Sequence, residues 1–204
     1  MIKAVIFDWG GVLIDDPSRE MTRFFAGKLG CGKDILVPAI SEYIGEFQTG
    51  RIAEDDMWEK ICASYGLKKP ASGSLWKEAV ENVFKDREDV FGLVSRIKKS
   101  GCITAFLSNT EQPAMEYFYE KKYYSYFDTA VFSCAEGCAK PEPEIYNITA
   151  KRLGIEPFEA VFIDDKPENI EGAEKTGMSG ILYKDLGDVV LRLRDFGLKM
   201  HGFF

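Results

Sequence analysis

Histidine is nearly absent from this sequence. Among 204 residues the only histidine is His201, which lies within the last four positions. Metal sites that need several imidazole ligands are therefore excluded. A serine–histidine–aspartate triad built on a histidine in the protein core is excluded for the same reason. Catalytic chemistry in this chain has to rest on other side chains.

Cysteine is also sparse. The five cysteines are odd in number and spread along the chain: Cys31, Cys62, Cys102, Cys134 and Cys138. The last two are close together, but they lack the two-residue spacing of a common zinc knuckle. We therefore expect free thiols in a reducing cytoplasm, not a disulfide framework.

No apolar run approaches the length of a membrane span, and the first run stops at Asp8, which is unlike a signal peptide. A basic block is missing too, since 26 basic and 33 acidic side chains give a formal net charge of −7. We expect a cytoplasmic protein with no membrane or nucleic-acid partner. An anionic substrate is compatible with this charge if a cation helps to bind it.

Hydrophobic residues, by contrast, make up 46% of the chain, enough for a sizeable core. Five apolar runs are typical of strands buried in a parallel sheet: Ile2–Phe7, Cys102–Leu107, Thr129–Ser133, Ala160–Ile163 and Ser179–Tyr183. Helical patterns lie between them at Glu88–Lys99, Pro113–Lys122, Glu142–Leu153 and Pro167–Lys175. The alternation predicts an α/β fold with a doubly wound, Rossmann-like parallel sheet.

Residues 16–86 break this alternation. They contain no convincing strand, and apolar residues recur there at helical spacing, with the second such face just after Pro38. This pattern predicts a small bundle of about four helices inserted after the first strand. The expected division is a core of residues 1–15 and 87–204 and an inserted helical unit of residues 16–86.

Polar residues follow each of the first four predicted strands. In chain order they are Asp8, then Ser108 and Asn109, then Lys140, and finally Asp164 and Asp165. Taken singly, each has an ordinary role as a turn former, a helix cap or a solvated side chain. Ligands of an open parallel sheet bind beyond the carboxyl ends of its strands, so we expect these residues to share one crevice.

Three carboxylates in one crevice would repel one another and raise one another's pKa values. A Mg²⁺ ion relieves this repulsion, because it prefers one or two carboxylates together with water and phosphate oxygens. Lys140 adds a fixed positive charge, and Ser108 with nearby backbone N–H groups can hold phosphoryl oxygens. The combination predicts a phosphoryl-transfer site in which one carboxylate is free to attack.

Four stretches of the chain resemble the haloacid dehalogenase (HAD) superfamily of hydrolases. In that family's order they are residues 6–13 (IFDWGGVL), 106–110 (FLSNT), 140–146 (KPEPEIY) and 161–170 (VFIDDKPENI). The inserted helical unit occupies the place of the family's C1-type cap. Receiver domains of bacterial response regulators use similar residues, but in a different order along the chain.

The resemblance implies a role for each matching residue. Asp8 matches the nucleophile that forms an aspartyl-phosphate intermediate, and its other oxygen binds Mg²⁺. Ser108 matches the phosphate-binding hydroxyl, with Asn109 beside it. Lys140 matches the lysine that offsets charge between nucleophile and phosphate. Asp164 matches a direct metal ligand and Asp165 an outer or water-mediated one.

Gly10 departs from the pattern, because phosphatases of this family commonly carry an aspartate there as general acid and base. Gly10 can offer its backbone carbonyl to the metal, but losing general acid–base catalysis costs roughly 10²–10⁴-fold in rate. The form of this motif resembles a branch of sugar-phosphate phosphatases and epoxide-hydrolase N-terminal domains. Two functions follow: a Mg²⁺-dependent phosphatase of a small phosphorylated metabolite, with sugar phosphates favoured by the branch, or a catalytically silent relative that binds a phosphoryl ligand or a protein partner.

Three further residues have two interpretations each. Trp9 either lines the cleft or packs beneath the cap. Arg51 lies at a helix break that resembles the family's substrate-specificity loop, and it either meets the substrate or is a solvated turn residue. Asp15 matches a carboxylate found near the cap hinge, or it caps the helix near Pro17.

Overall fold

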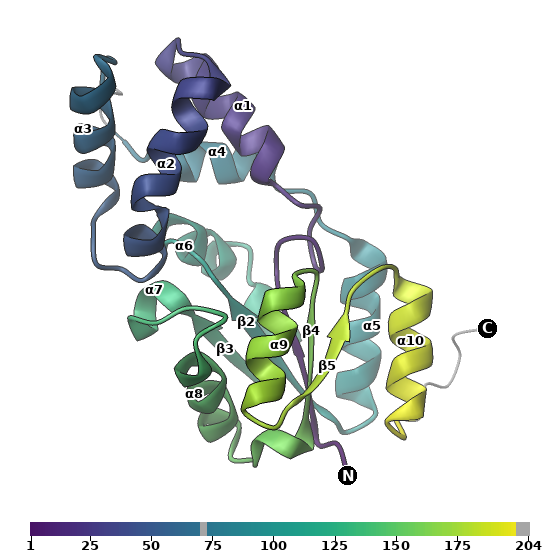
Figure 1. Cartoon of the computed structure of the whole chain (residues 1–204). Helices are drawn as coiled ribbons and strands as arrows, with labels where there is room; N and C mark the ends of the chain where they lie inside the picture. Colours follow the sequence, from purple (N-terminus) through teal and green to yellow (C-terminus); the bar gives the residue numbers. More distant parts are fainter. Residues whose placement is uncertain (70–72, 199–204) are drawn as a thin grey trace.

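The computed structural model describes residues 1–69 and 73–198. Its sheet has five parallel strands in the order β3-β2-β1-β4-β5 (Figure 1). They are β1 (Ala4–Phe7), β2 (Ile103–Ser108), β3 (Thr129–Phe132), β4 (Ala160–Asp164) and β5 (Ser179–Leu182). The predicted α/β fold with a doubly wound parallel sheet is confirmed. The central strand β1 ends at Phe7, beside Phe106 of β2 and Ile163 of β4.

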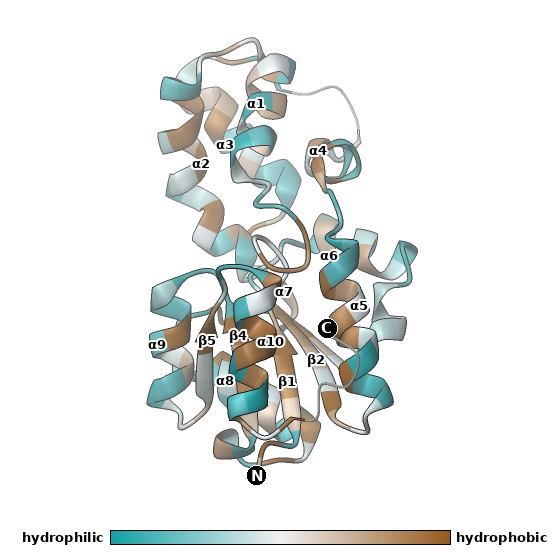
Figure 2. Ribbon diagram, turned by 90° about the vertical axis from the view of Figure 1, so that its right-hand side faces the viewer, coloured by the Kyte–Doolittle hydropathy of each residue, from teal (hydrophilic) through white to brown (hydrophobic). Residues whose placement is uncertain are grey.

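Helices cover both faces of the sheet, and side chains of β1 alternate between the two layers. Val5 and Phe7 share a core with α5 (Glu88–Lys99) and α10 (Leu186–Asp195). Ile6 packs in a second core with α8 (Pro143–Leu153) and α9 (Pro167–Lys175). Figure 2 shows hydrophobic segments of the strands in brown between helices that also carry hydrophilic residues in teal. Burial on both faces explains why the strands are continuous apolar runs.

The remaining short elements connect strands β2 to β5. Helix α6 (Gln112–Glu120) and the 3₁₀ turn η1 (Tyr123–Tyr126) lie between β2 and β3. The single turn α7 (Ser133–Glu136) follows β3, and η2 (Pro157–Glu159) precedes β4. The predicted third strand therefore ends one residue early, because Ser133 begins α7.

Four helices lie between β1 and α5, beyond the carboxyl ends of the strands (Figure 1). They are α1 (Ser18–Leu29), α2 (Lys33–Gln48), α3 (Glu54–Tyr65) and α4 (Leu75–Val83). Aromatic rings join them: the ring of Phe25 lies 5.1 Å from Trp58 and 5.0 Å from Trp76, centroid to centroid. Residues 16–69 and 73–86 contain no β-strand.

Helix α2 starts before the apolar face that the sequence pattern places after Pro38. It begins at Lys33, so Pro38 lies inside the helix. Proline has no backbone N–H, so Pro38 cannot donate a hydrogen bond to a carbonyl in the first turn of the helix. The helix continues through this position all the same. None of the helices in the described part of the chain is both long and apolar enough to cross a bilayer.

Candidate active site

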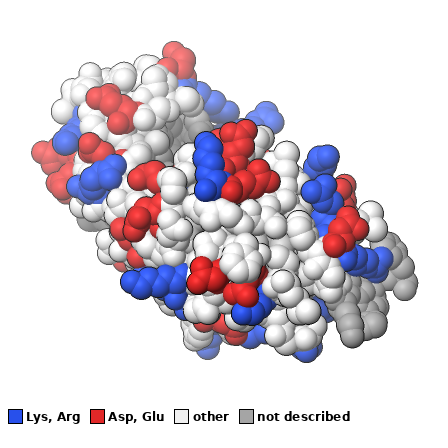
Figure 3. Space-filling model, turned by 60° about the horizontal axis from the view of Figure 1, so that its bottom comes forward, with Lys and Arg blue, Asp and Glu red and all other residues white. Residues whose placement is uncertain are grey.

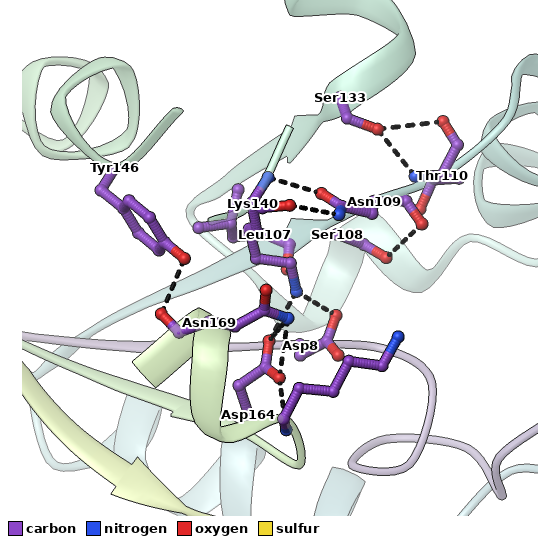
Figure 4. Close-up of polar contacts among 11 residues, drawn as sticks. Asp8, Leu107, Ser108, Asn109, Thr110, Ser133, Lys140, Tyr146, Asp164 and Asn169 are labelled. Atoms are coloured by element: carbon purple, nitrogen blue, oxygen red, sulfur yellow. Dashed lines mark hydrogen bonds and ion pairs between the residues drawn. The ribbon is translucent and has the colours of Figure 1, made fainter. Parts of the chain in front are cut away.

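Four segments converge at the carboxyl edge of the sheet. Asp8 directly follows β1, Ser108 and Asp164 are the last residues of β2 and β4, and Lys140 lies between β3 and α8. Figure 4 shows these side chains pointing toward one another. All four are at most 6% exposed. The parallel strand order therefore brings together the residues that the sequence places at strand ends.

The Lys140 ammonium is the electrostatic centre of this cluster. Its Nζ lies 2.6 Å from Asp8 Oδ1 and 2.7 Å from Asp164 Oδ2, and it donates to the carbonyl oxygen of Leu107 at 3.2 Å. Burial disfavours the charged ammonium, but the two carboxylates outweigh this and raise the pKa of Lys140. The lysine therefore holds a buried, permanent positive charge between two acidic side chains.

The acidic part of the cluster consists of Asp8, Asp164 and Asp165. Each offers an oxygen, and these oxygens lie within 4.8 Å of one another. Burial, with the nearby charge of Asp164, outweighs the contribution of Lys140 and raises the pKa of Asp8 to about 7. Burial and Asp164 also raise the pKa of Asp165. One lysine leaves an excess of negative charge that a cation would relieve.

The three carboxylates form a donor set that suits a hard divalent cation. Oδ1 of Asp165 is buried and lacks a hydrogen-bond partner, which is costly unless a ligand completes it. Gly11, at a φ of +80°, leaves room for this carboxylate, because a Cβ there would lie 2.2 Å from Asp165 Oδ2. The residues therefore fit a metal ion, and Asp8, Asp164 and Asp165 would hold it.

Asp164 is held in place by groups to which the sequence analysis gave no role. The Asn169 amide donates to both carboxylate oxygens of Asp164 at 3.0 Å, and the Lys166 backbone N–H donates to Oδ1 at 2.8 Å. The Tyr146 hydroxyl donates to the Asn169 carbonyl at 2.7 Å (Figure 4). Asn169 belongs to the recognised 161–170 stretch, and its spacing of five residues from Asp164 is the signal that could have identified it.

Asn109 positions Lys140. Its side-chain amide donates to the Lys140 carbonyl and accepts from the Lys140 N–H, both at 2.8 Å. Ser108 lines the cavity. Its hydroxyl donates a hydrogen bond to the Asn109 carbonyl at 3.5 Å. Phosphate binding by Ser108 and Asn109 stays a prediction, and the amide of Asn109 already has these two backbone partners.

A cavity of about 370 Å³ lies between this cluster and helices α1, α2 and α4. Gly10 and Trp9 both line the cavity, although Trp9 is only 3% exposed. The Trp9 ring meets those of Phe84 and Phe106 at 5.1 and 5.3 Å, so both interpretations of this residue apply.

Arg51 lies elsewhere. It is exposed, its Nη1 is 3.5 Å from the Gly137 carbonyl, and it is not among the described residues that line the cavity. Asp15 forms an ion pair with Arg87, Nε to Oδ1, at 3.0 Å. The N-cap of α1 is Pro17, and the Asp16 carboxylate accepts a hydrogen bond from the Ser18 N–H at 3.0 Å.

Glu111 also lines the cavity and was missed by the sequence analysis. It precedes α6 and is buried, with 7% exposed. Its carboxylate accepts hydrogen bonds from Gln48 Nε2 at 2.8 Å and Trp76 Nε1 at 3.1 Å. Its place three residues after Ser108 is a weak signal, because a glutamate before a helix is usually a surface residue.

A comparison with protein-family models matches residues 2–177 to the haloacid dehalogenase-like hydrolase family. The chain belongs to this family. One curated relative is sesquiterpene phosphatase astK of Aspergillus oryzae, to which the chain is 28% identical over 193 residues. The match covers 94% of this chain and 95% of that protein. It is 26% identical over 190 residues to D-ribitol-5-phosphate phosphatase of Bacteroides thetaiotaomicron, covering 87% and 89%. The family makes the protein a hydrolase, and both of these relatives are named as phosphatases.

Solved structures show the same HAD fold. A HAD family enzyme of Bacteroides thetaiotaomicron, in a magnesium complex, has a TM-score of 0.80 at 23% identity, covering 94% of this chain and 98% of that one. Some relatives are much longer: the chain spans 18% of mouse acyl-CoA dehydrogenase family member 10.

Proposed function

We propose that this protein is a Mg²⁺-dependent phosphatase that hydrolyses a small phosphorylated metabolite through an aspartyl-phosphate intermediate on Asp8. The observation that carries the proposal is the buried cluster in which Lys140 pairs with Asp8 and Asp164, with Asp165 within 4.8 Å of both carboxylates. This arrangement combines a carboxylate nucleophile with positive charge for a phosphoryl group.

The chain's own groups divide the reaction into two steps. An oxygen of Asp8 attacks phosphorus, and the ester oxygen leaves with its bonding electrons as an alkoxide, which takes a proton from solvent water to become the alcohol. Water then attacks the aspartyl phosphate, which releases inorganic phosphate and restores Asp8. Lys140 holds Asp8 in place and offsets charge in both steps, and Ser108 donates a hydrogen bond to a phosphoryl oxygen.

The metal proposal rests on the donor set. Asp8, Asp164 and Asp165, with the backbone carbonyl of Gly10, would hold Mg²⁺, which neutralises charge on the phosphoryl oxygens when bound. The similar Bacteroides structure is a magnesium complex, and this supports the choice of ion. The orphaned, buried Oδ1 of Asp165 supports the presence of a cation in this chain.

We also propose the domain division given by the sequence, with residues 1–15 and 87–204 as the core and 16–86 as a cap over the cavity. All five cysteines are free thiols, which supports the expected cytoplasmic location. The face in Figure 3 carries basic and acidic groups interspersed, an arrangement that does not suit a nucleic-acid backbone on this face.

The second candidate, a catalytically silent binder of a phosphoryl ligand, is favoured by Gly10, which supplies no carboxylate. Turnover of 4-nitrophenyl phosphate with Mg²⁺ separates the two functions. We expect turnover by the wild-type protein and loss of at least about a thousandfold in Asp8→Asn, because an amide cannot serve as the nucleophile. Wild-type protein that binds phosphate but shows no turnover would support the silent function. Asp56→Asn, on the exposed side of α3, is the matched control.

A further inference from the structure

Most of the side chains on the wall of the cavity opposite the carboxylate cluster are apolar. Helices α1, α2 and α4, with the residue that follows α4, contribute the apolar residues Met21, Phe25, Ile40, Ile44, Trp76 and Phe84. Four polar residues of α1 and α2 also line the cavity, and each already donates a side-chain hydrogen bond within the protein: Ser18, Thr22, Ser41 and Gln48. A phosphate group placed at Asp8 directs the rest of the ester toward this wall, because the cluster occupies the core side of the same cavity. Hydroxyl groups placed against such a wall would lose their hydrogen bonds to water without replacement.

Positive charge is confined to the core side of the cavity. Of the described residues that line it, only Lys140 and Lys166 are cationic, and both lie in loops of the core. Nζ of Lys140 is already paired with Asp8 and Asp164. A second phosphate or a carboxylate on the leaving group would therefore find no cation on the wall formed by the cap helices.

Glu111 places a carboxyl group beside this wall. The hydrogen bonds from Gln48 and Trp76 hold its carboxylate where the cap helices meet the core. Burial raises the pKa of Glu111, and these two donors oppose the shift by favouring the ionised form. In its ionised form this buried carboxylate repels an anionic leaving group more strongly than an exposed one would, because water screens it less.

We propose that the cavity selects phosphate monoesters of a largely apolar alcohol without a second anionic group, and that Glu111 is the residue that rejects anionic leaving groups. This inference rests on the proposed phosphatase function and narrows its substrate. It departs from the sugar phosphates favoured by the motif branch, because the apolar side chains of the wall offer no partners to sugar hydroxyls and its polar side chains already donate hydrogen bonds within the protein.

A matched pair of esters tests the apolar wall. Cyclohexylmethyl phosphate and glucose 6-phosphate are both primary alkyl esters on a six-membered ring. We expect kcat/KM to be at least about tenfold higher for the cyclohexylmethyl ester. Each ester is also measured as a competitor of 4-nitrophenyl phosphate, so that relative affinity is obtained where turnover is slow. Equal or better use of glucose 6-phosphate would overturn the proposal.

Two variants of α2 locate the effect. Ile44→Asn, inside the cavity, is expected to reduce the preference for the cyclohexylmethyl ester several-fold. Val37→Asn lies on the same helix, is 49% exposed and is not among the lining residues, so it should leave the preference unchanged. A preference that survives in folded Ile44→Asn protein would count against the wall as its source.

The role of Glu111 is tested with phenyl phosphate and 4-carboxyphenyl phosphate. We expect wild-type protein to prefer the phenyl ester at least about tenfold in kcat/KM, and Glu111→Gln to lower this ratio several-fold. Glu116→Gln, on the exposed side of α6, is the control. Acceptance of both esters by the wild-type protein, or an unchanged ratio in folded Glu111→Gln, would overturn the role. Failure to hydrolyse 4-nitrophenyl phosphate would instead refute the phosphatase function itself.

Discussion

At the scale of single residues, Gly10 is the position where the chain departs from its family. Gly10 is not among the glycines with positive φ, and a Cβ built on it would lie 3.4 Å from Pro17 Cδ, an ordinary contact. Gly11 differs, because a side chain there would collide with Asp165. The backbone therefore tolerates a side chain at residue 10 but not at residue 11.

Restoring a carboxylate by Gly10→Asp should help poor leaving groups most. Protonation of the leaving oxygen matters more for an alkyl ester than for an aryl ester, because the alkoxide is more basic. General acid–base catalysis contributes roughly 10²–10⁴-fold in rate. We therefore expect the ratio of aryl to alkyl kcat/KM to fall roughly tenfold or more in the variant.

The ratio is measured with 4-nitrophenyl and cyclohexylmethyl phosphates in wild-type and variant protein. Gly27→Asp, in α1 with open space around its Cβ, controls for added charge and should not change the ratio. A folded Gly10→Asp protein with an unchanged ratio would mean that another group already transfers the proton.

The sequence predicted which polar residues lie together at the carboxyl ends of the strands. Asp8, Ser108, Lys140 and the Asp164–Asp165 pair follow successive strands, and parallel strands bring their ends together. Glu111 could not be predicted in this way, since its place in the cavity depends on Gln48 and Trp76 of the inserted helices. Those contacts arise only when the inserted helices pack against the loop that precedes α6.

At the scale of elements, the two chain segments that connect core and inserted helices are tied together. The Asp15 N–H donates to the Lys85 carbonyl at 3.0 Å, and the Arg87 N–H donates to the Leu13 carbonyl at 2.9 Å. The Arg87 side chain donates to the Gly11 carbonyl at 2.7 Å, and its guanidinium lies over the Tyr183 ring, 5.3 Å from its centroid. Arg87 thus links the loop after β1 to both connecting segments.

Removing the guanidinium by Arg87→Met should destabilise the fold. The Gly11 carbonyl loses its charged donor and Asp15 loses its partner, so we expect a loss of about 1–3 kcal/mol in the free energy of unfolding. Urea denaturation measures it. Arg23→Met removes an exposed pair with Glu20 within α1, and should change stability by less than about 1 kcal/mol. Equal effects of the two variants would contradict the linking role of Arg87.

Element types were predictable where the apolar signal was strong, as in the five continuous apolar runs that form the strands. Boundaries were less so. Pro38 suggested the beginning of a helical face, but tertiary packing of Leu36 and Ala39 extends α2 back to Lys33. Helix α10 had no place in the predicted pattern, although Val189, Val190 and Leu193 bury its inner face. The third strand was correct in position and one residue too long.

At the scale of the whole molecule, stability and the proposed metal are coupled through the buried charges. Without a cation, Lys140 is the only cationic side chain within salt-bridge distance of Asp8 or Asp164 in the described residues. A ligand that binds only the folded state stabilises it by about 2.7 kcal/mol at a hundredfold excess over its Kd. Mg²⁺ should therefore raise the unfolding free energy of the wild-type protein and EDTA should reverse the effect.

Lys140→Met sharpens this expectation. Removing one partner of a buried ion pair leaves uncompensated charge, so we expect a loss of about 3–5 kcal/mol in the free energy of unfolding without metal. If Mg²⁺ binds between the carboxylates, it supplies the missing positive charge, and the stabilisation by Mg²⁺ should be larger in Lys140→Met than in wild type. Urea denaturation with EDTA or with Mg²⁺ measures both quantities without any turnover.

Lys77→Met, which breaks the partly exposed pair with Glu120, should respond to Mg²⁺ as the wild type does. Absence of a Mg²⁺ effect in both wild-type and Lys140→Met proteins would refute the metal site, because three carboxylates that fail to bind the ion even without their competing lysine cannot be its ligands.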